Sequence, residues 1–284
     1  MSFLEALMQG IIQGLTEFLP VSSSGHLSLY QHFTGNNGEG ALLFSAVLHL
    51  GTLVAVFIAF RKTICELLVE LFYLIKDIFT GKFKWKAMNP QRRAIIMMVI
   101  SLAMLIPFYI FKDYFERAAE DSDIIIEGLC FLYTSVILFI SDRCVKGNKK
   151  FGDITTKNAV TVGTFQGIAL LPGISRSGST ISSGLFCGFE RETAVQYSFI
   201  LGIPAILGGC LLQVKDAVEQ KALEFDFVNF AVGFIVSAIK MVNWLVKSDK
   251  FKVFAIYTFI LGIAVIGIGI FEHSVGMNIV EYFK

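Results

Sequence analysis

The residues best able to do chemistry gather in one polar interruption of an apolar stretch, the segment 13–26, which reads QGLTEFLPVSSSGH. Glu17 and His26 lie within ten residues of each other, with three serine hydroxyls between them. A hydroxyl, an imidazole and a carboxylate are the parts of an activated nucleophile. The alternative is that Ser22–Ser24 only cap a helix and His26 bonds to backbone. Ionisable groups in an apolar segment are costly and usually functional, which favours catalysis.

A second polar loop, 175–180, reads SRSGST and carries one guanidinium, Arg176, ahead of another apolar piece. Backbone amides at a helix N-terminus and a forked cation suit a phosphate. An arginine that reaches a lipid headgroup is the alternative, but Arg176 lies in the middle of its segment. The sequence has no GxxxxGK[ST] nucleotide motif. Together the loops predict phosphoryl transfer on an anionic, membrane-resident ligand. Mg²⁺ or Ca²⁺ beside Glu17 is the candidate cofactor, and no organic cofactor is expected.

Membrane helices must hold these loops, because 55% of the residues are hydrophobic, only 17% are charged and the mean hydropathy is +0.67. Lipid must cover much of this apolar surface. We predict an all-α integral membrane protein with one domain, 1–284. Six stretches have the length of about 20 residues that a span needs: 41–60, 92–112, 124–141, 194–214, 228–246 and 252–271. Apolar residues at helical spacing, interrupted by four charged residues, predict an interfacial amphipathic helix over 64–80.

Apolar pieces too short to cross a membrane flank each polar loop. They are 3–19 and 27–33 around the first loop, and 158–171 and 180–189 around the second. Each pair predicts a re-entrant helical hairpin, because a loop at membrane depth must be buried in protein or line a wet cavity. Gln13-Gly14 and Gln166-Gly167 precede the loops, and three spans follow each hairpin. Repeats of about 1–141 and 158–271 would therefore be inverted, with their polar tips meeting near the midplane.

Positive charge is unevenly divided among the loops. The loop 61–93 carries eight Lys and Arg residues and 142–157 carries five, whereas 112–122 and 215–227 carry two each. Under the positive-inside rule the basic loops are cytoplasmic. Both termini would then lie on the outer side of the membrane, and the site would open to the outer face.

Other residues carry structural expectations. Glu5, Glu127 and Lys240 lie near helix ends and are expected to pair within the bundle. The N-terminal stretch lacks a signal-peptide pattern and is expected to be retained. No nucleic-acid partner is expected.

Without CxxC spacing, the cysteines are expected to be lone thiols: Cys65, Cys130, Cys144, Cys187 and Cys210. Six glycines would allow close helix contacts, including those of a homodimer: Gly202, Gly208, Gly209, Gly262, Gly267 and Gly269.

At its two polar loops the chain resembles the undecaprenyl-diphosphate phosphatase family of the bacitracin-resistance type. The signature (E/Q)xxxE with its continuation PVSSxGH matches 13–17 and 20–26, and the signature PGxSRSG matches 172–178. Their order, separation and flanking hydropathy agree over nearly the whole chain. The resemblance implies hydrolysis of undecaprenyl pyrophosphate to undecaprenyl phosphate and inorganic phosphate. That reaction recycles the lipid carrier of peptidoglycan precursors, and abundant enzyme is associated with bacitracin resistance.

The resemblance also implies catalytic roles for Glu17, Ser23, His26 and Arg176. Ser23 would attack the terminal phosphorus with His26 as its base or as the later acid; His26 as the nucleophile is the alternative. Arg176 and the amides of 177–179 would stabilise the equatorial oxygens. Glu17 would orient the base or hold the cation, aided by Gln13, which stands where many members have Glu. The residues expected to bind phosphate are Gln13, Ser22, Ser24, Gln166, Ser175, Ser177, Gly178 and Ser179.

A transporter or flippase of polyprenyl phosphate is the main alternative function. Inverted repeats with broken helices and a midplane site are typical of secondary transporters. That architecture gives no reason for a hydroxyl, an imidazole and a carboxylate beside an arginine loop. Phosphate release by pure protein in detergent, where no gradient exists, separates the two functions.

Overall fold

The protein is helical throughout the described residues, apart from an isolated parallel bridge between Lys149 and Phe189. The computed structural model describes residues 2–35, 41–85, 88–111, 124–171, 173–219, 226–245, 251–276 and 278–282. The longer helices are α1 (Phe3–Thr16), α2 (Ser23–Thr34), α3 (Ala41–Ala59), α4 (Arg61–Phe79), α5 (Pro90–Ala103), α8 (Ile125–Asp142), α9 (Thr156–Ile168), α10 (Arg176–Phe186), α11 (Arg191–Glu219), α12 (Phe227–Leu245) and α13 (Phe251–Val275). Short helices are α6 (Leu105–Ile110), α14 (Ile279–Tyr282) and the 3₁₀ turn η2 (Phe151–Asp153).

Every predicted span coincides with a helix, but fewer than six of these helices qualify as candidate membrane spans. Among the described residues, four helices are long and apolar enough to cross: Pro90–Ile110 (α5 with α6), α8, α11 and α13. The α3–α4 pair qualifies only when its two members are taken together, and α12 is counted over Phe227–Lys240 alone. The side chains at 41–42 and 241–245 are outside the described set. This leaves Leu43–Ala59 of α3 and Phe227–Lys240 of α12, both of which are shorter than a span. The fold is thus all-helical with four to five candidate spans.

The predicted amphipathic segment forms α4, which meets α3 at a bend of 89°. Its charged side binds the start of α5, where Arg92 donates to Glu70 at 2.6 Å and to Asp77 at 2.8 Å. Its apolar side is exposed, with Phe72 and Phe79 at 66% and 87% exposure. This division of faces is typical of a helix that lies along a membrane surface.

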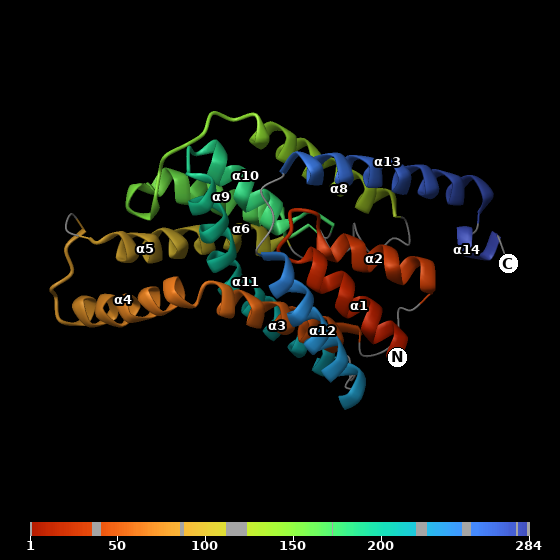
Figure 1. Ribbon diagram of the computed structural model, residues 1–284, viewed down its shortest axis with the longest axis horizontal. Coiled ribbons are helices and arrows are strands. Elements are labelled where there is room, and N and C mark those ends of the chain that lie inside the picture. Colours follow the sequence, from red (N-terminus) through yellow and green to blue (C-terminus); the bar gives the residue numbers. More distant parts are fainter. Residues whose placement is uncertain are drawn as a thin grey trace.

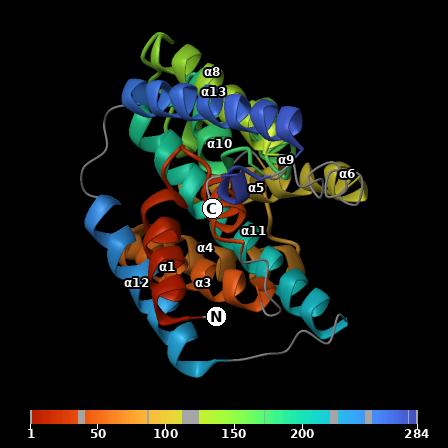
Figure 2. The ribbon, with the colours of Figure 1, turned by 90° about the vertical axis from the view of Figure 1, so that its right-hand side faces the viewer.

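The helices pack in pairs that join distant parts of the chain. Helix α1 lies against α12 and α12 against α3, while α9 lies against α5 and α6 (Figures 1 and 2). Helices α8 and α13 run side by side along one edge of the molecule. Glycines allow each hairpin to approach a neighbouring helix closely: a Cβ at Gly14 of α1 would overlap the Ser237 carbonyl of α12, and one at Gly163 of α9 would overlap the Ser101 carbonyl of α5.

The glycines that were expected to support helix contacts differ in what surrounds them. A Cβ at Gly262 of α13 would lie 2.8 Å from the Gly128 carbonyl of α8, so this glycine does bring two helices together. Gly202 instead faces the Arg176 guanidinium. At Gly208 and Gly209 no heavy atom lies within 4 Å of an added Cβ, so these glycines border open space.

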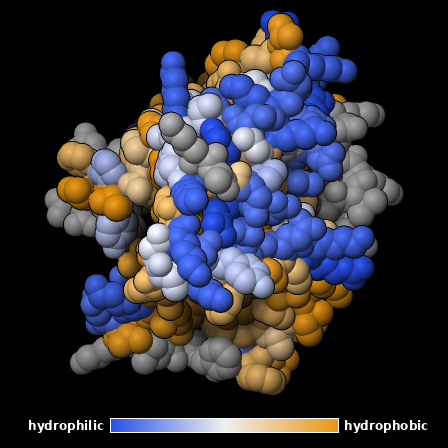
Figure 3. Space-filling model, turned by 90° about the vertical axis from the view of Figure 1, so that its left-hand side faces the viewer, coloured by the Kyte–Doolittle hydropathy of each residue, from blue (hydrophilic) through white to orange (hydrophobic). Residues whose placement is uncertain are grey.

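One end of the molecule is hydrophilic. The face shown in Figure 3, the left-hand end of Figure 1, has hydrophilic side chains across its centre and hydrophobic ones along its lower edge. The ends of α4 and α5 and the turn between α8 and α9 lie at this end (Figure 1). These are the segments in which the sequence concentrates its Lys and Arg residues.

Candidate active site

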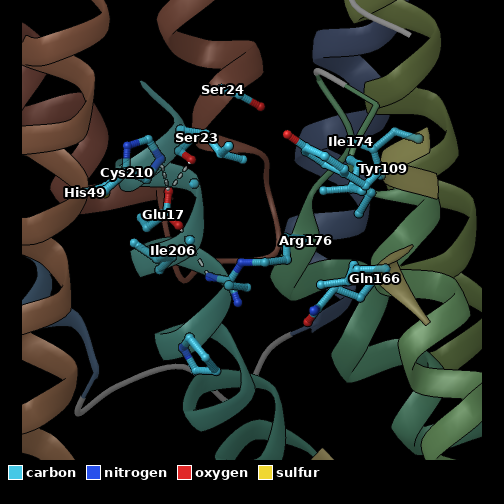
Figure 4. A pocket seen from close by; sticks show the side chains of 18 of the residues that line it. Glu17, Ser23, Ser24, His49, Tyr109, Gln166, Ile174, Arg176, Ile206 and Cys210 are labelled. Atoms are coloured by element: carbon cyan, nitrogen blue, oxygen red, sulfur yellow. Dashed lines mark hydrogen bonds and ion pairs between the residues drawn. The ribbon is translucent and has the colours of Figure 1, made fainter. Parts of the chain in front are cut away.

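Glu17 is the centre of the site and comes from the turn that follows α1. Its Oε2 accepts hydrogen bonds from Ser23 Oγ at 2.5 Å and from Gln13 Nε2 at 2.9 Å. Its other oxygen, Oε1, accepts from Arg176 Nη2 at 3.3 Å. Glu17 is only 7% exposed, so these donors replace the water that a carboxylate would otherwise hold. The structure thus brings Gln13, Glu17, Ser23 and Arg176 together. Figure 4 shows the last three of these side chains.

Arg176 is the first residue of α10, and its guanidinium fits between two helices. The cation lies over the Phe18 ring, 5.1 Å from the ring centroid. Gly202 of α11 provides the room, because a Cβ there would overlap the guanidinium. Its Nη1 is buried and has no hydrogen-bond partner in the described part of the chain. A buried guanidinium with a free N–H is prepared to bind an anion.

The two hairpin tips contact each other directly, which confirms the prediction that they meet. Ser177 Oγ donates to the Leu19 carbonyl at 2.8 Å, and the Gly173 amide donates to Ser24 Oγ at 3.3 Å. Pro172, part of the second signature, lies outside the described residues. These bonds hold the first loop in register with the second, so that Arg176 reaches Glu17.

A cavity of 520 Å³ opens beside the Glu17–Arg176 pair. Glu17, Ser23, His49 and Arg176 line its polar end, and mostly apolar side chains of α5, α6, α9 and α11 form the rest. Gln166 of α9 also lines it, is 2% exposed and has no partner for either side-chain amide atom in the described part of the chain. Two buried polar groups without partners, Gln166 and Arg176 Nη1, therefore border one cavity (Figure 4).

The structure does not bring His26 to the cavity. Its Nδ1 lies 2.6 Å from the Ser22 carbonyl, and its Nε2 lies 2.7 Å from the Tyr257 hydroxyl. The ring stacks on Tyr257 and meets Phe131 edge-on. Ser23 instead donates to Glu17, so the expected pairing of Ser23 with His26 is not seen in this arrangement.

Several serines of the loops serve the helix ends. Ser22 caps α2 and Ser175 caps α10, each accepting from the amide three residues later. The Gly178 and Ser179 amides, predicted to bind phosphate, donate to Ser175 Oγ and to the Ser175 carbonyl. The cap and the first helical turn already use these donors, and phosphate binding by this loop stays a prediction. Ser22, Ser24 and Ser175 still line the cavity.

Sequence reasoning missed His49, which lies inside the predicted span 41–60. Its Nδ1 is 2.7 Å from the Ser45 carbonyl, and its Nε2 is 3.5 Å from Glu17 Oε2. A carbonyl oxygen only accepts, so Nδ1 carries a hydrogen, and Nε2 donates to Glu17 only when the imidazole is protonated. An ionisable residue in the middle of an apolar stretch was the signal that would have found it.

The residues fit a divalent cation only in part. The described residues contain no group of three or more His, Cys, Asp or Glu side chains arranged to hold a metal. Gln13 Oε1 is, however, buried without a hydrogen-bond partner in the described part of the chain, close to the Glu17 carboxylate. One carboxylate and one amide oxygen, completed by substrate phosphate oxygens, suit Mg²⁺ or Ca²⁺.

Glu5 and Glu127 have the structural roles that were expected. Glu5 forms a capping box with Ser2 at the start of α1. Glu127 of α8 accepts from Ser28 Oγ at 2.7 Å and so ties α8 to α2. Lys240 is exposed at the described end of α12, where its Cβ packs near Gly14.

Comparison with known proteins places this site in a family. Residues 6–264 match the family described as bacitracin resistance protein BacA. The chain is 39% identical to undecaprenyl-diphosphatase 4 of Bacillus thuringiensis subsp. konkukian, over 94% of this chain and 97% of that protein. It is 37% identical to the undecaprenyl-diphosphatase of Alkaliphilus metalliredigens and 40% identical to that of Desulforapulum autotrophicum, over 94% and 93% of this chain and 98% and 97% of those proteins. The chain therefore belongs to the bacitracin resistance protein BacA family.

Proposed function

We propose that this protein hydrolyses undecaprenyl pyrophosphate to undecaprenyl phosphate and inorganic phosphate. The relatives named above are undecaprenyl-diphosphatases, and the site supplies what phosphoryl transfer needs. One observation carries the proposal: Ser23 Oγ is 2.5 Å from Glu17 Oε2, while Arg176 binds the other oxygen of the same carboxylate. A nucleophile, a proton acceptor and a cation thus share one buried position beside a cavity.

In the mechanism, Ser23 Oγ attacks the terminal phosphorus and Glu17 accepts its proton. The new Ser–O–P bond replaces the bond from that phosphorus to the bridging oxygen, and undecaprenyl phosphate leaves. Arg176, through its free Nη1, stabilises the charge on the transferring group. Glu17 gives this proton to the departing undecaprenyl phosphate or to solvent and becomes a carboxylate again. It then takes a proton from the water that attacks the phosphoserine and returns it to Ser23 Oγ, so that phosphate leaves and the hydroxyl is restored.

His26 as nucleophile or base remains the second candidate. It would have to leave the Ser22 carbonyl and Tyr257 to reach the cavity. Trapping the phosphoenzyme with labelled pyrophosphate and mapping the label to Ser23 or His26 separates the two. Label on neither residue, with a single water attack, would exclude both covalent routes.

Where a divalent cation is needed, Glu17 and Gln13 Oε1 would hold it together with the pyrophosphate. The ion would neutralise phosphate charge and help to orient the terminal group. The residues of the chain provide the position, the nucleophile and the proton acceptor whether or not the ion is bound.

The finer architecture is part of the same proposal. Six spans and two re-entrant hairpins form an inverted repeat in a bacterial plasma membrane, with both termini outside and the site open to the outer face. The uneven loop charge and the hydrophilic end in Figure 3 support this orientation. Cysteine labelling at positions 82 and 148 against position 120 tests it; labelling of the basic loops from outside would overturn it. A homodimer stays a prediction, tested by the mass of the detergent-solubilised protein.

The transporter alternative is not supported. The relatives are named for a hydrolytic activity, and the Ser23–Glu17 hydrogen bond has no part in a pure transport mechanism. The family name also ties the protein to bacitracin resistance.

The first experiment measures phosphate release from undecaprenyl or farnesyl pyrophosphate by the purified protein, with and without Mg²⁺ or Ca²⁺. Ser23→Ala and Arg176→Ala should each lower kcat by about 10³-fold or more, because one removes the nucleophile and the other the charge stabilisation. Full turnover by Ser23→Ala would exclude Ser23 as nucleophile. No turnover by folded wild-type protein would exclude the enzyme itself.

A further inference from the structure

Helix α11 passes the site with a face of small or helix-weakening residues. Pro204, Ala205, Gly208 and Gly209 all line the cavity. Their spacing puts them on one side of the helix. A proline inside a helix removes a backbone hydrogen bond, and each interior glycine costs about 1 kcal/mol relative to alanine. Because an added Cβ at either glycine would meet nothing within 4 Å, packing inside the chain does not require them.

The opposite wall of the cavity is apolar and leads outward. Ile106 and Tyr109 of α6 and Leu170 after α9 line it and are 63%, 47% and 42% exposed. Figure 4 shows Tyr109 across the cavity from Ile206 of α11. In a chain of this hydropathy, exposed apolar side chains at a cavity mouth face lipid hydrocarbon. The cavity therefore opens sideways, not only toward water.

The inner end of the same cavity is polar and lacks partners. Arg176 Nη1 and the amide of Gln166 are buried there without hydrogen-bond partners in the described part of the chain. Unpaired buried polar groups are costly, so they indicate a polar ligand group at this end. A cavity with an anion-binding end and an apolar, lipid-facing end fits an amphiphile.

The size of the cavity limits how much of the amphiphile it holds. If each heavy atom takes about the 30 Å³ that a water occupies in the liquid, 520 Å³ holds roughly 17 heavy atoms. A pyrophosphate group uses about half of these. The remainder is enough for one or two isoprene units, far less than a long polyprenyl chain.

We propose that the face of α11 formed by Pro204, Ala205, Gly208 and Gly209 is a groove for the first isoprene units of the substrate. The rest of the chain passes between α6 and α11 into the bilayer. This inference rests on the proposed function and deepens it. The tail gains little hydrophobic energy by leaving lipid for the groove, because lipid is as apolar as the protein. Shape and dispersion contacts along a smooth helix face must therefore supply the selectivity.

The test compares phosphate release from farnesyl and dimethylallyl pyrophosphate by the purified full chain. The wild type should favour the farnesyl compound in kcat/KM. Gly208→Leu and Gly209→Leu fill the groove and should lower kcat/KM for farnesyl pyrophosphate by about tenfold or more, mainly through KM. The loss for dimethylallyl pyrophosphate, which extends less far along α11, should be smaller. Gly208→Ala should have the same effect in weaker form.

Gly267→Leu is the matched control. Gly267 lies in α13, also borders open space and does not line the cavity, so this variant should keep the substrate ratio of the wild type. Leucine is a better helix former than glycine, so size-exclusion profiles should show that all three Leu variants are folded. An unchanged ratio in both groove variants, or an equal change in Gly267→Leu, would overturn the groove. Wild-type protein that hydrolyses neither compound would overturn the proposed function as well, whereas hydrolysis with an unaffected ratio overturns the groove alone.

Discussion

The two hairpin loops use the same kind of serine cap to present different chemistry. Ser22 and Ser175 each cap the following helix by accepting from the amide three residues later, at 3.2 Å and 3.0 Å. The residue after the cap is Ser23 in the first loop and Arg176 in the second. Both side chains bind Glu17. The site is therefore divided between two similar elements, with the nucleophile on one and the cation on the other.

The loops also differ in backbone strain, and the glutamines in the helices before them differ in hydrogen bonding. Ser22 has a φ of +70°, a left-handed conformation that is unusual for serine, whereas Ser175 has a φ of −70°. Gln13 donates to Glu17, but Gln166 has no partner in the described part of the chain. Strain is thus found in the loop that carries the nucleophile, as often at active sites. The helix before the loop with the cation keeps the side-chain amide of Gln166 available to a ligand.

The largest effect should come from removing the group that both loops share. Glu17→Gln should lower kcat by about 10³-fold or more, because Ser23 loses its proton acceptor and Arg176 its ionic partner. Phosphate release measures it. Glu127→Gln is the control, because Glu127 is a buried carboxylate that binds Ser28 and does not line the cavity; it should stay within about threefold of wild type. Similar losses in both variants would argue against a special role for Glu17.

The next effect tests how the second loop is positioned. Gly202→Ala places a methyl group where the Arg176 guanidinium lies, so the cation must shift away from Glu17. We expect kcat to fall by about 10- to 100-fold, since small displacements of catalytic groups are costly. Gly267→Ala, in open space on α13, should have no effect. Full activity of a folded Gly202→Ala variant would show that Arg176 acts from another position.

A smaller effect is expected at His49, which touches only the side of Glu17 that binds Ser23. His49→Ala should lower kcat by about tenfold, because Glu17 loses a side chain that donates to it when the imidazole is protonated. His49→Gln keeps an N–H donor and should lose less. The steady-state rates of the two variants measure the difference, and equal losses would indicate that His49 acts by charge alone.

The smallest effect is expected at Tyr257, the partner of His26. Tyr257→Phe removes one hydrogen bond of about 1 kcal/mol and should change kcat by no more than about fivefold. His26→Ala in parallel shows whether the ring itself is needed. A loss of more than about 100-fold in Tyr257→Phe would place His26 in the reaction and contradict the division between the two loops.

The sequence predicted most of the site because its polar residues interrupt apolar helices. Such interruptions are costly in lipid, which is why the loops with Glu17 and Arg176 could be identified before their geometry was known. The meeting of the two tips followed from the predicted hairpins. His49 was missed because it interrupts a span singly, without a proline or a run of serines around it. Its contact with Glu17 depends on how α3 packs, which hydropathy does not reveal.

The orientation of His26 was equally beyond the sequence. Its distance from Ser23 along the chain is short, but one turn of α2 directs the ring toward Tyr257 of α13, which lies 231 residues away. The number of crossings was also uncertain from hydropathy alone, because an apolar stretch such as α3 can end in an 89° bend. Side-chain direction and helix angles are set by tertiary packing.

The bonds between the hairpin tips also constrain how the chain is made. The contacts of Ser177 with Leu19 and of Gly173 with Ser24 join residues 158 and 149 positions apart. During synthesis the first hairpin emerges long before its partner, with the Glu17 carboxylate lacking the arginine that neutralises it. Closing such distant contacts is slow, and the active site can form only as a late step of biogenesis. A chain divided between α8 and α9 should therefore be active only when both halves are produced in the same cell.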